Sequence, residues 1–268
     1  GNNYDYLQEM MHRQKLNTVC EEADCPNIAE CWGHRTATFM ILGDTCTRSC
    51  GFCAVKVGNP NEVDLREPRR VADAVKELNL RHVVITSVDR DDLPDGGATI
   101  FSETVKEIRQ LMPDTTIEIL IPDFKGNEGS FGIIMQNPPD ILNHNLETVP
   151  RLYPFVRPQA KYERSLELLL WFKEHNLRTK SGIMVGIGEQ PDEVLALMQD
   201  LIKYKCDILT IGQYLQPTKQ HLPIDRYVAP DEFKMYKDEG LKMGFKFVES
   251  GPLVRSSYNA DAQAREIL

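Results

Sequence analysis

The chain has 268 residues, of which 41% are hydrophobic and 26% charged, a composition typical of one large globular domain with its own core. The formal net charge of −9 argues against nucleic acid as a partner, because binding a phosphate backbone needs a basic surface. No apolar run approaches the roughly 18–20 residues that cross a bilayer, so no membrane partner is expected. Seven cysteines in a chain of this length do not suggest a secreted disulfide framework, and we expect a reducing compartment.

Short β-rich runs alternate with helical patterns along the chain. The predicted strands are residues 38–42, 82–87, 116–121, 140–144, 178–185 and 207–212, with residues 246–249 as a candidate seventh strand. The predicted helices are residues 69–78, 100–111, 162–175, 193–203 and 231–243. Pro191 and Pro230 are each followed by two acidic residues, a pattern typical of the first turn of a helix.

This alternation predicts an α/β fold in which parallel strands are covered by helices through right-handed crossovers. About six repeats fit a partial (β/α)6 TIM-type barrel, and a doubly wound sheet remains an alternative because periodicity alone does not close a barrel. In either fold, functional residues are expected at the carboxyl ends of the strands. We divide the chain into an N-terminal extension, residues 1–35, a barrel, residues 36–250, and a C-terminal segment, residues 251–268.

Six of the seven cysteines form two triplets near the N-terminus. The first, spaced C-x4-C-x5-C, is Cys20, Cys25 and Cys31, and the second, spaced C-x3-C-x2-C, is Cys46, Cys50 and Cys53. Three thiolates supply three of the four corner ligands of a [4Fe–4S] cluster, and the remaining iron is open to a substrate or cofactor. Zinc is the alternative for both triplets, although zinc sites usually have paired C-x2-C arms and four protein ligands. The seventh cysteine, Cys206, opens a predicted strand and is expected to be a small core residue.

The second triplet lies in the loop directly after the first predicted strand, and an aromatic residue, Phe52, precedes its last cysteine. In this position it resembles the signature of the radical S-adenosylmethionine (SAM) superfamily, C-x3-C-x-aromatic-C. The resemblance implies that these cysteines hold a [4Fe–4S] cluster whose open iron binds SAM, and that an electron from the cluster cleaves SAM to a 5′-deoxyadenosyl radical. The residues between the cysteines would shape the loop and donate backbone N–H groups toward sulfur.

Nearly the whole chain resembles the lipoyl synthase family. Besides the N-terminal triplet, the matching segments are residues 85–98, 143–154, 156–166, 179–189, 211–223 and 251–261. Gln159, where glycine is usual, and Asn259, where histidine is common, depart from the family pattern, but neither is a proposed ligand. The resemblance implies insertion of two sulfur atoms at carbons 6 and 8 of an octanoyl chain, which is amide-linked to a lysine of a carrier protein.

The resemblance also implies a second [4Fe–4S] cluster that donates the sulfur and is consumed. Its ligands would be Cys20, Cys25, Cys31 and Ser257, the last from the motif Arg255-Ser256-Ser257-Tyr258. A hydroxyl oxygen is a weaker partner for iron than a thiolate, which suits a cluster that must open. Without the family, two adjacent serines would be interpreted as a solvated turn or a helix cap.

Contacts with SAM are expected from residues at several strand ends. Asn145 and Glu147 resemble the superfamily's ribose-binding pair, and Arg164 would form a charge-assisted fork with the SAM carboxylate. Ser87 would assist with the SAM amino group, and Phe52 would lie beside the cofactor. A surface salt bridge is the alternative for Arg164. The acid-rich stretch of residues 89–97 is expected to be solvated or to help bind SAM, substrate or a protein partner.

The partners that the resemblance implies are octanoylated lipoyl carrier domains or the glycine-cleavage H protein, an electron donor such as flavodoxin or ferredoxin, and an iron–sulfur carrier that rebuilds the consumed cluster. A monomer in the cytoplasm is expected, or in an organelle if the source is eukaryotic and a transit peptide is missing. Two rival hypotheses stay open. One is a different radical SAM enzyme that inserts sulfur or methylthio groups, and the other is an electron-carrier or cluster-transfer protein without its own substrate.

Overall fold

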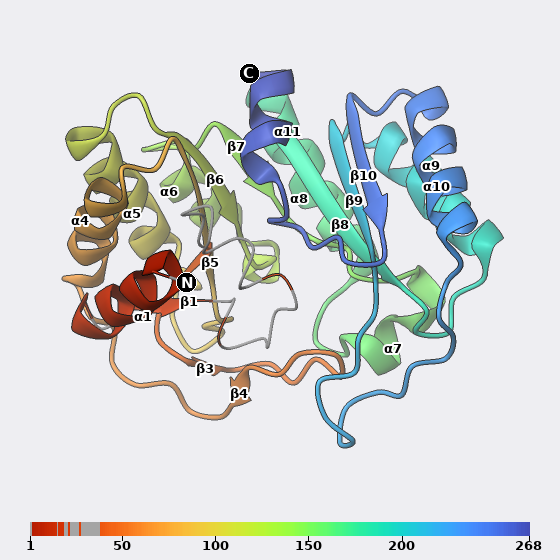
Figure 1. Ribbon diagram of the computed structural model, residues 1–268, viewed down its shortest axis with the longest axis horizontal. Coiled ribbons are helices and arrows are strands. Elements are labelled where there is room, and N and C mark those ends of the chain that lie inside the picture. The colour runs from red at the N-terminus through yellow and green to blue at the C-terminus, as the bar shows by residue number, and fades with distance from the viewer. Residues whose placement is uncertain (1, 15, 19–20, 22–26, 28–37) are drawn as a thin grey trace. The chain divides into compact units, whose positions relative to one another are not determined.

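The structure, a computed structural model, describes residues 2–14, 16–18, 21, 27 and 38–268. The chain divides into two compact units, residues 1–48 with 55–140, and residues 49–54 with 141–268. In both units, parallel strands alternate with helices, as Figure 1 shows.

The first unit has the strand order β1-β2-β5-β6. Its strands are β1 (Asn17–Thr18), β2 (Thr38–Ile41), β5 (His82–Ser87) and β6 (Thr116–Leu120), and a separate pair is β3 (Thr45–Cys46) with β4 (Lys56–Val57). Its helices are α1 (Asn2–Gln14), α4 (Glu67–Leu78), α5 (Ala98–Leu111), the 3-10 helix η1 (Phe124–Gly126) and α6 (Glu128–Ile134). Strand β1 is antiparallel to β2, whereas β2, β5 and β6 are mutually parallel.

Local sequence explains these elements. All four residues of β2 and the first five of β5 are buried, as apolar runs in a parallel sheet require. Helix α4 begins with Glu67 and Pro68, and Asn79 ends it in the left-handed conformation at φ 50°. Gly97 caps the N-terminus of α5 with a φ of 92°, which favours glycine, and an added Cβ there would lie 2.2 Å from Leu42 Cδ1. Helices α4 and α5 lie side by side (Figure 1).

The second unit has the strand order β7-β8-β9-β10, and all neighbouring strands are parallel. Its strands are β7 (Ile141–Asn143), β8 (Arg178–Val185), β9 (Ile208–Gln213) and β10 (Phe247–Gly251). Its helices are η2 (Pro150–Leu152), α7 (Tyr153–Val156), α8 (Tyr162–Glu174), α9 (Pro191–Lys203), α10 (Pro230–Met243) and α11 (Ala260–Ile267). Every residue of β9 is buried, so this strand forms the centre of the unit.

All seven predicted strands and all five predicted helices are confirmed, with ends that differ by at most two residues. Helices α1, α6, α7 and α11 and the short strands β1, β3 and β4 were not predicted. Within the described part of the chain, no helix is both long enough and apolar enough to span a membrane.

Candidate functional site

The C-x3-C-x2-C loop follows β2, at the carboxyl end of the strand where the sequence predicts chemistry. Its first ligand candidate, Cys46, lies in β3 and is anchored there because its carbonyl accepts a hydrogen bond from Gly58 N at 3.0 Å. Cys46 belongs to the first unit, and Cys50 and Cys53 belong to the second. None of these three cysteines forms a disulfide within the described residues.

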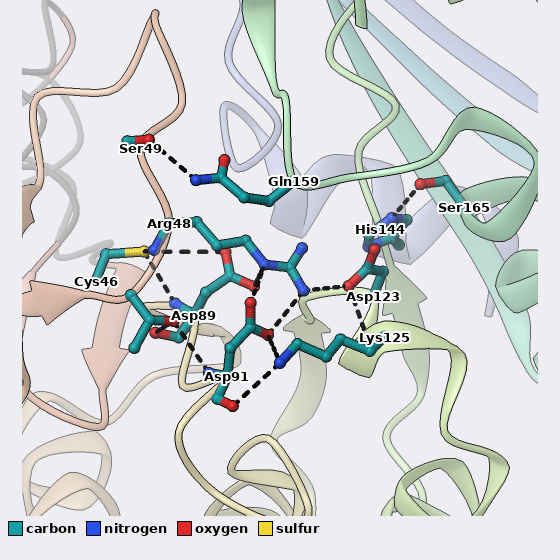
Figure 2. Close-up of polar contacts among 11 residues, drawn as sticks. Cys46, Arg48, Ser49, Asp89, Asp91, Asp123, Lys125, His144, Gln159 and Ser165 are labelled. Carbon is teal, nitrogen blue, oxygen red and sulfur yellow. Dashed lines mark hydrogen bonds and ion pairs between the residues drawn. The ribbon is translucent and has the colours of Figure 1, made fainter. Parts of the chain in front are cut away.

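The sulfur of Cys46 lies among backbone donors. Arg48 N and Asp89 N donate to Cys46 Sγ at 3.4 and 3.3 Å, and Asp89 Oδ2 lies 4.0 Å from the same sulfur (Figure 2). Burial and the charge of Asp89 raise the pKa of the Cys46 thiol. A bound metal ion ionises a coordinating thiol, and two N–H groups directed at its sulfur then stabilise the thiolate. This environment therefore fits an iron ligand.

Arg48, two residues after Cys46, is almost completely buried at 3% side-chain exposure. Its guanidinium donates to both oxygens of Asp91 at 2.8 and 2.9 Å and to Asp123 at 2.6 Å, and its Nε lies 3.3 Å from Asp89 (Figure 2). Burial alone would lower the pKa of Arg48, but these carboxylates outweigh it and raise the pKa above its ordinary value. The cysteine loop is thus bound to the loops that follow β5 and β6.

The acid-rich stretch after β5 is largely paired within the first unit. Asp89 and Asp91 face Arg48, and Asp92 accepts from its neighbour Arg90 at 2.8 and 2.9 Å. Asp95 accepts from Gly97 N and Thr99 N at the start of α5. Asp92 is exposed, as expected of a solvated charge run. The other acids named here hold the cysteine loop and α5, and binding of SAM, substrate or a partner by this stretch stays a prediction.

The second half of the loop curls into a turn, in which Cys53 N donates to Cys50 O at 3.2 Å. Gly51 lies against the loop after β9, because an added Cβ would lie 2.8 Å from Leu222 Cδ1. Gly51 N donates to Val156 O at 2.9 Å, and Gly51 O accepts from Leu222 N at 3.0 Å. Phe52, between Gly51 and Cys53, is half-buried. Glycine at this position lets two loops approach the cysteine turn closely.

The ribose-binding candidates Asn145 and Glu147 follow β7 and are brought together. The Glu147 backbone pairs with β8 through Gly182 O at 3.0 Å and Met184 N at 2.8 Å, and its φ of 66° is in the left-handed region. Burial raises the pKa of the Glu147 carboxyl, although Arg157 and a hydrogen bond with Asn145 oppose the rise. Asn145 Oδ1 is buried and has no hydrogen-bond partner among the described residues, so it can accept a hydrogen bond from a ligand hydroxyl.

Glycine in β8 makes room for this pair. A Cβ added at Gly182 would lie 2.8 Å from Asn145 Oδ1 and 2.7 Å from Thr210 Oγ1. Arg157, which the sequence analysis did not single out, donates to the carbonyls of Asn145 and Leu146 at 2.6 and 3.2 Å. Its only sequence signal was its place in the segment of residues 156–166 that matches the family. The segment after β7 that carries Asn145 and Glu147 therefore packs against Gly182 of β8 and is also held by Arg157.

The other SAM-contact candidates lie at separate places. Ser87 ends β5, and its Oγ is buried without a hydrogen-bond partner in the described chain. Arg164 lies in the first turn of α8 and is half-buried, and the next residue, Ser165, forms a 2.9 Å hydrogen bond with His144 (Figure 2). These two side chains stay candidates by position alone.

Of the second ligand set, only Ser257 is described, because Cys20, Cys25 and Cys31 lie outside the described residues. Ser257 occupies a half-buried turn that precedes α11, where Tyr258 N donates to Arg255 O at 2.9 Å. Within the part of the chain that the structure describes, no three Cys, His, Asp or Glu side chains form a ready-made metal cage. The support for cluster binding is therefore the cysteine motif together with the local contacts of Cys46.

Cys206, the seventh cysteine, is confirmed as a core residue. It is 3% exposed and its thiol donates weakly to Ile208 O at 3.4 Å. Burial raises the pKa of the Cys206 thiol to about 12.

Comparisons with known proteins find relatives along nearly the whole chain. The profile of the radical SAM superfamily matches residues 40–201. A lipoyl synthase of Rubrobacter xylanophilus is 59% identical over 268 residues, which cover 99% of this chain and 84% of that relative. A mitochondrial lipoyl synthase of Nematostella vectensis is 54% identical over 261 residues, which cover 97% of this chain and 91% of that relative.

Among solved structures, SuiB of Streptococcus suis bound to S-adenosylmethionine is similar with a TM-score of 0.63 at 14% sequence identity. The alignment covers 85% of this chain and 54% of that chain. A likeness at this identity shows the fold alone. It confirms the predicted fold class, the parallel α/β architecture of the partial-barrel enzymes, over the doubly wound alternative.

Proposed function

The chain belongs to the radical SAM superfamily and, within it, to the lipoyl synthase family, and from this premise we propose that it inserts two sulfur atoms at carbons 6 and 8 of a protein-bound octanoyl-lysine. The observation that carries the proposal is a match to lipoyl synthases along 99% of the chain, with both cysteine triplets present. The reaction class is sulfur transfer to carbons that have no acidic proton.

Membership of the superfamily implies SAM and one [4Fe–4S] cluster, and we assign that cluster to Cys46, Cys50 and Cys53. When bound, the cluster would supply an electron and SAM would supply the carbon radical, and this radical is what can abstract hydrogen from an unactivated C–H bond. The protein's own residues have a different task. Arg48 N and Asp89 N stabilise the Cys46 sulfur, and the buried Arg48 fork keeps the first half of the loop in place.

Four groups of side chains are proposed to orient SAM. Asn145 Oδ1 and the Glu147 carboxyl are proposed to receive the ribose hydroxyls. The support is that Asn145 Oδ1 has no hydrogen-bond partner in the described part of the chain and that burial raises the pKa of the Glu147 carboxyl. Ser87 Oγ would accept the amino group, and Arg164 would pair with the carboxylate. Phe52 would cover the cofactor and exclude water. These assignments agree with the chemistry of the side chains present.

The sulfur donor is proposed to be a second [4Fe–4S] cluster held by Cys20, Cys25, Cys31 and Ser257. The support is the family match together with the spacing C-x4-C-x5-C. In this division, residues 1–35 carry the donor cysteines, residues 36–250 the SAM-cleaving barrel, and residues 251–268 the serine ligand. The hydroxyl ligand would leave more readily than a thiolate when the donor opens.

The partners follow from this reaction. We propose octanoylated lipoyl domains or the glycine-cleavage H protein as substrate, a flavodoxin or ferredoxin as reductant, and an iron–sulfur carrier to rebuild the donor. We place the enzyme in the cytoplasm, or in an organelle in a eukaryotic source, and expect a monomer.

Anaerobic reconstitution followed by incubation with SAM, reductant and an octanoyl-lysyl peptide tests the proposal. Roughly eight irons per chain are expected for two clusters, and the peptide should gain the mass of two sulfur atoms with release of 5′-deoxyadenosine. Deoxyadenosine without sulfur incorporation would favour another radical SAM activity. No deoxyadenosine at all would favour an electron carrier.

A further inference from the structure

We propose that His221 is a positioning residue for the SAM-cleaving cluster, because its hydrogen bond to the Cys53 carbonyl fixes the peptide that carries the last cysteine of the loop. The inference rests on the proposed function, since it assumes a cluster on this loop. His221 and Cys53 are 168 residues apart in the chain and both belong to the second unit.

The geometry assigns a role to each ring nitrogen. His221 Nε2 lies 2.9 Å from Cys53 O, and a carbonyl oxygen can only accept, so Nε2 carries the proton. On the other side of the ring, Nδ1 lies 2.8 Å from Thr218 Oγ1. In the neutral imidazole, the Thr218 hydroxyl donates to Nδ1 and thereby selects this tautomer. Both nitrogens are satisfied, so the ring has one defined orientation.

The segment that carries His221 is itself anchored to β9. Tyr214, which directly follows β9 and is 1% exposed, donates its hydroxyl to Leu222 O at 2.7 Å. Gln216 Nε2 donates to the carbonyl of His221 at 2.9 Å. Because the buried Tyr214 binds the residue that follows His221, the position of the His221 Nε2 donor is fixed relative to β9. A flexible surface loop could not position a ligand in this way.

Other contacts of the cysteine turn act on different residues. Leu222 N and Val156 O bind the backbone of Gly51, and Gln159 Nε2 donates to Ser49 Oγ at 3.0 Å (Figure 2). These contacts hold the turn as a whole, whereas His221 acts on Cys53 itself. Gln159 is also one of the two departures from the family pattern, and this contact gives it a structural role in this chain.

The orientation of the Cys53 carbonyl matters because the same peptide unit sets the direction of the Cys53 side chain. Partners that orient metal ligands typically change metal affinity about 10- to 100-fold when they are removed. We therefore expect loss of the His221 donor to weaken the cluster on this loop and to change its electronic surroundings. The overall fold should persist, because His221 is half-buried in a loop and outside the core.

Measurements on a Cys25→Ala background isolate the loop cluster, because the donor cluster is disabled. The variants are His221→Leu, which removes the donor, and His221→Gln, whose amide N–H restores one. His175→Leu is the matched control, since His175 is exposed at the end of α8 and contacts Trp171. Two readouts are the rate of iron release to a chelator and the electron paramagnetic resonance spectrum of the reduced cluster, with circular dichroism as the check on folding.

His221→Leu should release iron about tenfold faster than the parent and show altered g values, while His221→Gln and His175→Leu should stay close to the parent. Equal release rates and identical spectra for His221→Leu and the parent would overturn the inference alone. A parent that binds no iron would overturn it together with the proposed function. If His221→Leu does not fold, Thr218→Val decides, because loss of the tautomer-selecting hydroxyl should also speed iron release, and an unchanged rate would refute the role of the ring.

Discussion

At the scale of single residues, the cysteine loop depends on charged side chains that lie far away in sequence. Asp89 and Asp91 follow β5 and Asp123 follows β6, yet all three carboxylates face the one guanidinium of Arg48. Asp123 is completely buried. Such a charge is tolerated only while its partner is present.

Replacing Arg48 by methionine should therefore destabilise the chain by about 3–5 kcal/mol, because buried carboxylates lose their counter-charge. Urea unfolding of the cluster-free protein measures this free energy. Arg66→Met is the control, because Arg66 is 89% exposed and lies 3.8 Å from Asp64, so a change within about 0.5 kcal/mol is expected. A similar, small change at both positions would show that the ion pairs of Arg48 contribute little to the free energy of unfolding.

Variants in the two cysteine triplets should differ in which product they fail to form. Cys50→Ala is expected to abolish 5′-deoxyadenosine formation, because the SAM-cleaving cluster loses a ligand. Cys25→Ala should still cleave SAM but transfer no sulfur, and Ser257→Ala should impair sulfur transfer in a single turnover. Chromatography of deoxyadenosine together with mass spectrometry of the peptide measures both. Thiolated product from Cys25→Ala would contradict the donor assignment.

The sequence predicted the candidate ligands but not the residues that support them. Cysteine spacing is local, so Cys46, Cys50 and Cys53 could be read directly as a cluster motif. Asp123 and His221 reach this loop only through tertiary folding, and nothing in their local sequence marks the contact. Arg48 lies between Cys46 and Cys50 in the sequence, but its burial depends on carboxylates from distant loops.

At the scale of elements, β8 positions the Asn145–Glu147 pair by having no side chain at Gly182. Gly182→Ala would place a methyl group 2.8 Å from Asn145 Oδ1, so Asn145 must move. We expect the KM for SAM to rise about tenfold, since displaced binding groups lose orientation. Steady-state deoxyadenosine assays measure this, with Gly132→Ala as control because its Cβ meets nothing within 4 Å. An unchanged KM would argue against the proposed ribose site.

Elements with strong apolar periodicity were predicted, and those stabilised by docking were not. In α1, the described buried side chains are Met10 and Met11, and the rest of the helix is mainly polar. Helix α11 buries Ala260, Gln263 and Ala264, and Ala264 belongs to the cluster that includes Ile141 and Ile208. Short amphipathic helices are marginal without such packing, so their sequences carry a weak signal.

At the scale of the whole molecule, stability should depend on pH through Glu67. This residue is 5% exposed at the start of α4, and burial raises its pKa although Leu42 N donates to it at 2.7 Å. Because the pKa of Glu67 is raised, its carboxyl binds a proton more tightly in the folded chain than in the unfolded one. Its contribution to the free energy of unfolding is therefore complete below the unfolded pKa of about 4.3 and is lost as the pH rises through the folded pKa.

Relative to Glu67→Gln, the wild-type protein should therefore lose unfolding free energy as the pH rises above about 4.3. Urea midpoints of both proteins across this range measure the difference. Parallel curves would mean that the Glu67 carboxyl ionises as easily in the folded chain as in the unfolded one. The amide of glutamine can still accept from Leu42 N, so the comparison isolates the charge.

The global fold was accessible from sequence because strands and helices alternate regularly over more than 200 residues. Alternation could not separate a partial barrel from a doubly wound sheet, since both use the same repeating unit. That choice depends on the long-range arrangement of the strands, and likeness to the solved structure of SuiB decided it.

The burial of Cys206 should keep its thiol from reacting with labelling reagents while the protein is folded. With its pKa at about 12 and 3% exposure, it should stay unmodified by iodoacetamide until the chain unfolds. Every label that native protein acquires must then come from the six motif cysteines. A simple alkylation count would thus follow loss of the metal–sulfur cofactors during catalysis, thiol by thiol.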